Sequence, residues 1–174
     1  MEDFRYPIGR FERPEKATRE VRQQWIEAIE SAPGQLQQAV AGLSQEQLDT
    51  PYRPRGWTIR QVVHHITDSH LNGYVRTKWA LTEDNPAIKT YEQNRWAESP
   101  EARTGDVELS LPLLESLHGR WSVLLRSFEP ETWSQTFQHP DWGTVSLDFN
   151  VALYAWHGAH HIAHITTLRK RNGW

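Results

Sequence analysis

Cysteine is absent from this 174-residue chain. Its absence excludes disulfides, thiolate nucleophiles, iron–sulfur clusters and cysteine-ligated zinc. Any bound metal must therefore be held by histidine and carboxylate side chains, a ligand set that suits zinc, nickel, iron or manganese.

Long apolar runs and strong charge of one sign are also missing. No apolar segment approaches the roughly 18–20 residues that span a bilayer, and the opening MEDFRYPIGR lacks the apolar stretch of a signal peptide. The formal net charge is −3 with no long basic run, whereas nucleic-acid binding needs a basic face. We expect a soluble, cytoplasmic protein that binds neither membranes nor nucleic acid.

The core must rely on large side chains. Hydrophobic residues make up 37% of the chain, nine residues are tryptophan, and the mean hydropathy is −0.73. Each tryptophan can bury about 150–250 Å². The length fits one domain over residues 1–174.

Hydrophobic periodicity predicts an all-α protein with four long helices. These helices are expected to begin near residues 14, 58, 106 and 148. Pro33-Gly34 predicts a kink or break in the first, and Thr58–Gln61 is a capping-box pattern that opens the second. Four long amphipathic helices joined by loops favour an antiparallel four-helix bundle.

Two connections differ from simple loops. Residues 82–105 form a long polar stretch containing Pro86 and Pro100, and connections of that length are often functional or mobile. Residues 134–147 carry β-favouring residues around a Pro-Asp-Trp-Gly turn. That pattern predicts a short β-hairpin before the last helix.

Histidine is concentrated in two clusters. In the last helix, WHGAHHIAHI (residues 156–165) places His157, His161 and His164 within a sector of about 60°. His157 and His161 are one turn apart, so their Cβ atoms lie roughly 5–6 Å from each other. Their imidazoles can converge on one metal ion, whereas His160 points about 100° away.

The second helix carries the other cluster, VVHHITDSH, with His64, His65 and His70. His70 lies near the centre of the apolar stripe, His65 lies at its margin, and His64 points more nearly outward. Periodicity leaves the choice between His65 and His70 open. We expect the site at one end of the bundle.

These histidines are also compatible with roles that involve no metal. Pairs four residues apart occur on solvated faces as well, and a histidine in an apolar stripe, such as His70 or His118, is often a hydrogen-bonded core residue. Clusters on two helices, with no cysteine competing, favour the metal. The HxxxH spacing does not indicate an HExxH metalloprotease, because Gly158 stands where the general-base glutamate would be.

Long strings of the chain resemble a known family, the DinB-like superfamily, and most closely its YfiT type of metal-dependent hydrolase. The strings are RYPIG (5–9), QLDTPYR (47–53), GWTIRQVVHHITDSH (56–70), LHGRW (117–121) and YAWHGAHHIAHI (154–165).

The resemblance implies a four-helix bundle whose metal ligands are one histidine of the second helix and two of the fourth. Carried over, these are His65, His157 and His161, which settles the choice of His65 over His70. The resemblance also implies zinc or nickel, one ion per chain, and a cytoplasmic homodimer. It does not establish a reaction, because fold and family do not specify a substrate.

Three imidazoles leave a coordination position open for water or for a small-molecule substrate, as in catalytic zinc sites. Hydrolysis would also need an acid and a base, for which the candidates are Asp68, His64, His118 and His164. We expect Asp68 to orient a ligand or lie at the surface. For His118 we expect a hydrogen-bonding core role, and for Tyr154 a packing role.

Two other functions are compatible with the sequence. Some members of the superfamily use the metal to activate a thiol cofactor for transfer or isomerisation. That chemistry would need a cationic, carboxylate-binding pocket, for which Arg76, Lys78 and Arg95 are available. The third possibility is a non-catalytic bundle that binds a metal or another ligand.

Overall fold

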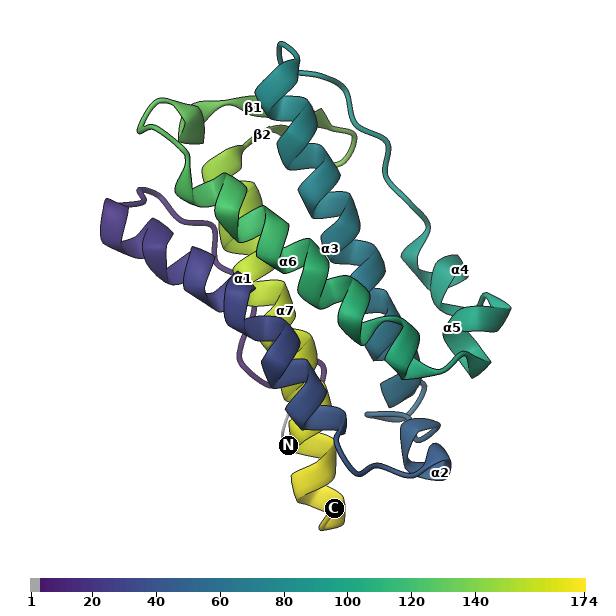
Figure 1. The fold of residues 1–174 in the computed structure, drawn as a ribbon. Coiled ribbons are helices and arrows are strands. Elements are labelled where there is room, and N and C mark those ends of the chain that lie inside the picture. The colour runs from purple at the N-terminus through teal and green to yellow at the C-terminus, as the bar shows by residue number, and fades with distance from the viewer. Residues whose placement is uncertain (1–3) are drawn as a thin grey trace.

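The structure is a computed structural model that describes residues 4–174, and four long helices form its bundle (Figure 1). These helices are α1 (Arg19–Val40), α3 (Ile59–Thr82), α6 (Leu111–Arg126) and α7 (Leu147–Asn172). Helix α1 packs against α6 and α7, and α3 packs against the same two helices from the other side. The four-helix bundle predicted from the sequence is confirmed.

The four long helices do not all run antiparallel to their neighbours. Helices α3 and α7 are antiparallel, as are α1 and α6, whereas α3 runs parallel to α6 and α1 runs parallel to α7 (Figure 1). Contacts along α3 and α6 show the parallel order, because His64 contacts Ser110 and the later His70 contacts His118. Antiparallel packing therefore describes two of the four adjacent pairs.

The segment between α3 and α6 causes the parallel pair, because it returns the chain to the end of the bundle where α3 begins (Figure 1). It is not a structureless loop. It contains α4 (Gln93–Ala97), α5 (Pro100–Thr104) and the 3-10 helix η1 (Val107–Leu109). Buried Gln61 of α3 fixes it by donating to the carbonyl of Ala97 at 2.7 Å.

Helix α1 is continuous through Pro33, so of the kink or break expected there, the break does not occur. The helix begins at Arg19, later than the predicted residue 14, because the Thr18 side chain caps it by accepting from the Val21 N–H. Pro33 has no N–H, so the carbonyl of Ile29 four residues earlier loses its usual donor. His118 of α6 contacts that carbonyl in place of the missing bond.

A two-stranded hairpin precedes α7, as predicted. Strands β1 (Thr136–His139) and β2 (Gly143–Ser146) pair antiparallel, with His139 opposite Gly143. Gly143 has φ of 68°, a left-handed conformation that closes a three-residue hairpin loop and favours glycine. Two short helices complete the fold, α2 (Gln45–Leu48) before α3 and the 3-10 helix η2 (Thr132–Ser134) before the hairpin.

The core consists of three clusters of buried apolar side chains. The first surrounds the start of α3 and the end of α7, the second contains Trp121 and Tyr154, and the third lies beneath the hairpin around Phe137. Within residues 4–174, no helix is long and apolar enough to cross a membrane.

Candidate metal centre

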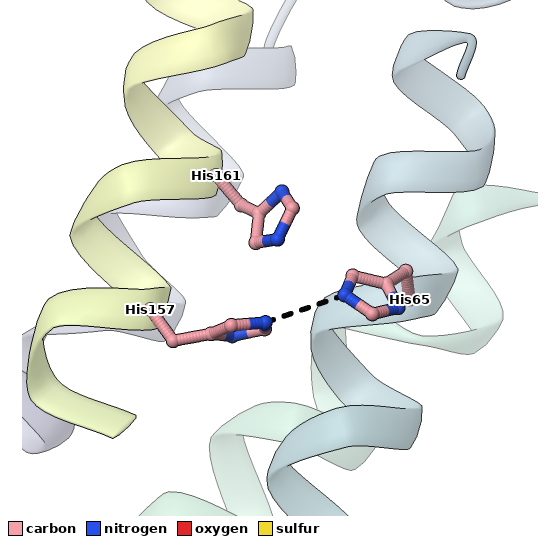
Figure 2. A group of neighbouring side chains, drawn as sticks. All are labelled: His65, His157 and His161. Carbon is pink, nitrogen blue, oxygen red and sulfur yellow. Dashed lines mark hydrogen bonds between the residues drawn. The ribbon is translucent and has the colours of Figure 1, made fainter. Parts of the chain in front are cut away.

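Three histidines on two antiparallel helices converge between α3 and α7. Figure 2 shows His65 of α3 facing His157 and His161, which lie one turn apart on α7. One ring nitrogen from each histidine can be chosen so that all three lie within 4.8 Å of one another. His65 and His161 are buried, and His157 is partly exposed. The structure thus brings together the three histidines that the resemblance implies.

The donor set and its spacing fit a divalent metal. Two ligands bound tetrahedrally at about 2.0–2.1 Å lie about 3.3–3.4 Å apart. The Nε2 atoms of His65 and His157 are 3.3 Å apart, a separation at which they also hydrogen-bond to each other. Two ring nitrogens at this distance can therefore serve as two corners of a metal site.

A chain of hydrogen bonds fixes which nitrogen of His157 carries its proton. The Nδ1–H of His118 donates to the Ile29 carbonyl, so the Nε2 of a neutral His118 is an acceptor. That Nε2 lies 2.8 Å from Nδ1 of His70, which must donate. The Nε2 of His70 then accepts from Nδ1 of His157 at 3.2 Å. The remaining Nε2 of His157 is left with a lone pair that faces His65.

A second, shorter series of hydrogen bonds fixes which nitrogen of His161 carries its proton. The Nε2–H of His164 donates to the carbonyl of Arg5 at 3.2 Å. Nδ1 of His164 therefore accepts from Nδ1 of His161 at 3.3 Å. The Nε2 of His161 is left unprotonated, so both clustered histidines of α7 present a lone pair from the same ring position.

Burial keeps these rings neutral, as metal ligands must be. It lowers the pKa of His65 to about 3, and the neighbouring His164 contributes to that shift. The pKa values of His157 and His161 lie well below 6.5, because burial and the neighbouring imidazoles both disfavour the charged form. The hydrogen-bond chains above are therefore chains of neutral rings at neutral pH.

Two pockets flank the three histidines. One, of about 400 Å³, is lined by His157 together with residues of α3, the hairpin turn and residues 90–94. The other, of about 290 Å³, is lined by His65 and His161 together with the aromatic and basic residues of segments 5–6 and 52–57. Gln93 and Asn94 line both pockets. Small molecules can thus approach the histidines from two sides.

Trp57 covers the cluster on the side of the smaller pocket. Its ring centroid lies 4.5 Å from that of His65 and 6.3 Å from that of His161. Trp57 stands one residue before the cap of α3, which places its ring over the first turns of that helix. The periodicity of α3 gave no indication of this role, because Trp57 precedes the helix.

The other histidine candidates have other partners. His118 is fully buried and uses both ring nitrogens, which confirms the expected core role. His64 is buried against Ser110 and the carbonyl of Gly105, so the expectation that it points outward is wrong. His164 lies behind His161 rather than at the ligand cluster. None of these three lines the pocket beside His157, whereas His164 lines the smaller pocket.

Asp68 and Tyr154 lie differently with respect to the pockets. Asp68 is half-buried, and burial with the nearby Glu101 raises its pKa to about 6. It lines neither pocket. Tyr154 is buried against Trp121 and the Gly73 backbone, in agreement with the expected packing role. It also lines the larger pocket, so packing is not its only contact.

Gly158 packs closely against α3 and α1. A Cβ at this position would lie 3.4 Å from Cε1 of His70 and 3.5 Å from the Ala32 side chain, which are ordinary contacts. A longer side chain here would have to extend past the His70 ring and Ala32.

The site lies in the middle of the bundle, so the expectation that it lies at one end is wrong. On α7, the first core cluster includes Ile162 and Ile165 beyond the ligands, and the second includes Val151 and Tyr154 before them. Apolar packing on both sides holds the two ligand-bearing helices at a fixed separation.

Several pocket residues were not identified from the sequence. Tyr91 comes from the connection after α3, and His139 and Trp142 come from the hairpin. The rings of His139 and Trp142 stack with centroids 4.3 Å apart. The signal for Tyr91 in the sequence was the unusual length of its connection, and the signal for His139 and Trp142 was the predicted hairpin. Of the three cations considered for a carboxylate pocket, Arg76 lines the pocket, whereas Lys78 and Arg95 are exposed outside both.

The fold and the site define a class, a four-helix bundle with one three-histidine cluster between two helices. Residues 28–165 match the family model of the DinB superfamily. The chain belongs to this superfamily.

Two relatives match this chain along its whole length. A Bacillus cereus (strain AH820) protein named "Putative metal-dependent hydrolase" is 54% identical over 174 residues, which is all of both chains. A Bacillus anthracis protein with the same name is also 54% identical over the full length of both.

Solved structures show the same fold. YfiT from Bacillus subtilis, described as "a probable metal-dependent hydrolase with an unusual four-helix bundle topology", is 46% identical. Its TM-score is 0.96, and the match covers 99% of each chain. The four-helix bundle protein TT2238 has a TM-score of 0.56 at 19% identity, over 81% of this chain and 94% of that one, and shows the fold alone.

Proposed function

We propose that this protein is a metal-dependent hydrolase of small-molecule esters or amides. One divalent ion per chain, zinc or nickel, would be held by His65, His157 and His161. The observation that carries the proposal is the convergence of three neutral imidazoles, two of which have their free lone pairs assigned by hydrogen-bond chains. The names of the full-length relatives support the same activity.

A divalent ion bound by these three imidazoles would supply a Lewis acid that lowers the pKa of a water molecule towards about 7, so that the water could act as a nucleophile at neutral pH. The chain itself supplies the pockets and the orientation. Pockets of about 400 and 290 Å³ fit small molecules better than a folded protein substrate. Two tyrosines, Tyr91 and Tyr154, line the larger pocket.

These tyrosines act as hydrogen-bond donors rather than as bases. Burial raises the pKa of Tyr91 to about 12 and also raises that of Tyr154. Both hydroxyls are therefore protonated at neutral pH and can donate to a carbonyl or leaving-group oxygen. The hydrogen-bond chain through His70 meanwhile holds the His157 ring in one orientation.

The test compares turnover of p-nitrophenyl esters and anilides by tag-free protein before chelation, after chelation and after reconstitution with zinc or nickel. The proposal expects turnover to disappear on chelation and to return with one ion per chain. If chelation lowers only the melting temperature and no form hydrolyses any ester or amide, the protein is a non-catalytic bundle. Metal-dependent transfer to an added thiol without hydrolysis would instead favour the thiol-cofactor chemistry.

We also propose that the protein works in the cytoplasm as a homodimer, as its resemblance to the family implies. Sedimentation equilibrium on the metal-loaded protein tests the dimer, and a mass of one chain at micromolar concentration would contradict it. Fractionation of the producing cell tests the compartment.

A further inference from the structure

The larger pocket contains a buried arginine that has no counter-ion. Arg76 of α3 is only 6% exposed and lines the pocket beside His157. Its Nη1 donates to the Tyr154 hydroxyl at 3.4 Å, a long contact, and its Nε–H has no acceptor. Within residues 4–174, no carboxylate forms an ion pair with it. The guanidinium is therefore buried, and part of its hydrogen-bonding capacity has no acceptor within the described residues.

Arg60, on the same helix, shows how this chain normally satisfies a buried arginine. Arg60 is 3% exposed and donates to the Asp49 carboxylate, the Gln45 side chain and the Gly105 carbonyl, at 2.7 to 2.9 Å. An uncompensated buried charge costs several kcal/mol. The contrast suggests that Arg76 gains its partner from outside the chain.

The surroundings of Arg76 favour an anion. The positive charge of Arg76 acts on three pocket residues, Tyr91, Tyr154 and His139, and lowers the pKa of each relative to burial alone. Nδ1 of His139 accepts from the Asp141 N–H at 3.1 Å, so a neutral His139 carries its proton on Nε2 and offers a donor. Two carboxylates, Glu92 and Asp141, also line the pocket, but both are exposed to solvent.

We propose that the larger pocket binds a substrate carboxylate through Arg76, so that the substrates of this site are esters or amides bearing an acid group. Guanidinium and carboxylate match in geometry and can pair through two parallel hydrogen bonds. The Tyr154 ring lies between Arg76 and the metal ligands, with its centroid 5.9 Å from that of His157. A carboxylate on Arg76 thus places the rest of a small substrate next to the three histidines. This inference rests on the proposed hydrolase function.

The test uses two p-nitrophenyl esters of equal length, the neutral hexanoate and the carboxylate-bearing hydrogen adipate, with zinc-reconstituted full-length protein. The measured quantity is the ratio of kcat/KM for the adipate to that for the hexanoate, after subtraction of spontaneous hydrolysis. Wild type is expected to prefer the adipate. Loss of a charge-assisted hydrogen bond predicts that Arg76→Gln lowers this ratio about 10- to 100-fold, mainly through KM.

Three further variants separate binding at Arg76 from folding, from net charge and from the other pocket. Arg76→Lys keeps the charge but not the paired geometry, so its ratio should lie between those of wild type and Arg76→Gln. Lys78→Gln removes one positive charge from the exposed face of the same helix and should leave the ratio unchanged. An unchanged ratio in Arg76→Gln overturns the proposal. So does a ratio lost in Arg53→Gln but kept in Arg76→Gln, because Arg53 lines the other pocket.

Binding without turnover separates this proposal from the hydrolase proposal. Metal-free protein is titrated with glutarate and with inorganic phosphate by isothermal calorimetry. Glutarate binding that is lost in Arg76→Gln and kept in Lys78→Gln supports the pocket even if neither ester is hydrolysed. No glutarate binding by wild type at millimolar concentration overturns it, as does phosphate binding at least tenfold more tightly than glutarate.

Discussion

The proton position of His157 depends on residues far from the histidine cluster. Pro33 removes a backbone donor in α1, and His118 donates to the freed Ile29 carbonyl. The hydrogen bonds continue through His70 to His157, so they connect the carbonyl freed by a proline in one helix to the free ring nitrogen in another. Mutating a residue that hydrogen-bonds to a metal-ligating histidine typically lowers metal affinity about 10- to 100-fold.

Replacing His70 should therefore weaken metal binding without removing a ligand. His70→Phe keeps an aromatic ring but removes the acceptor for the Nδ1–H of His157, and we expect the zinc dissociation constant to rise about 10- to 100-fold. His70→Gln offers a side-chain oxygen as acceptor and should retain more of the affinity. Competition with a chromophoric chelator measures these constants.

The control is His160→Phe, which replaces a buried ring on α7 that stacks on Trp156 and belongs to neither hydrogen-bond chain. Its affinity should stay within about threefold of wild type. Equal weakening in His70→Phe and His160→Phe would show that general packing, and not the chain of hydrogen bonds, sets the affinity.

At the scale of elements, the sequence predicted the helices and the hairpin but not their directions. Periodicity reports which face of a helix is buried, and it identified the α7 stripe of His157 and His161 correctly. It carries no information on the path of residues 83–110, which makes α6 parallel to α3. It also could not separate His65 from His70, because both face neighbouring helices, one towards the cluster and the other towards His118.

Gly73 of α3 marks the closest approach between α3, α6 and α7. A Cβ there would lie 2.4 Å from the Tyr154 ring and 2.8 Å from Trp121. We expect Gly73→Ala to lower the free energy of unfolding by about 1–3 kcal/mol, because overpacking must displace these rings. Urea unfolding of the metal-free protein measures the change.

Gly119 of α6 provides the matched comparison. It is an exposed helix residue, and a Cβ there would meet nothing within 4 Å. Gly119→Ala should raise the free energy of unfolding by about 0.5–1 kcal/mol, the usual gain of alanine over glycine in a helix. A stability loss of similar size in both variants would contradict the close approach at Gly73.

For the whole molecule, buried neutral histidines make stability depend on pH. Burial lowers the pKa of His118 to about 4, against 6.5 in the unfolded chain. Between these values the unfolded chain binds the proton and the folded protein does not, so the free energy of unfolding falls as pH falls below about 6.5. One such group contributes up to about 1.4 kcal/mol per pH unit. Asp68, whose pKa is raised to about 6, acts in the opposite direction below pH 6.

Urea unfolding of metal-free protein at pH 7.5, 6.0 and 5.0 tests this dependence. We expect wild type to lose stability steadily from pH 6.0 to 5.0. His118→Asn can still donate to the Ile29 carbonyl but cannot titrate, so its loss over the same interval should be smaller by about 1 kcal/mol. A wild-type stability that is constant from pH 7.5 to 5.0 would contradict the burial of neutral histidines.

Metal content tests the central claim most directly. Elemental analysis of tag-free protein should give about one zinc or nickel ion per chain in wild type. The ion should be lost in His65→Ala, His157→Ala and His161→Ala, and it should be retained, although bound more weakly, in His70→Ala. A wild type that holds no stoichiometric metal even after reconstitution would contradict the three-histidine metal site and leave these histidines as a polar network in the core.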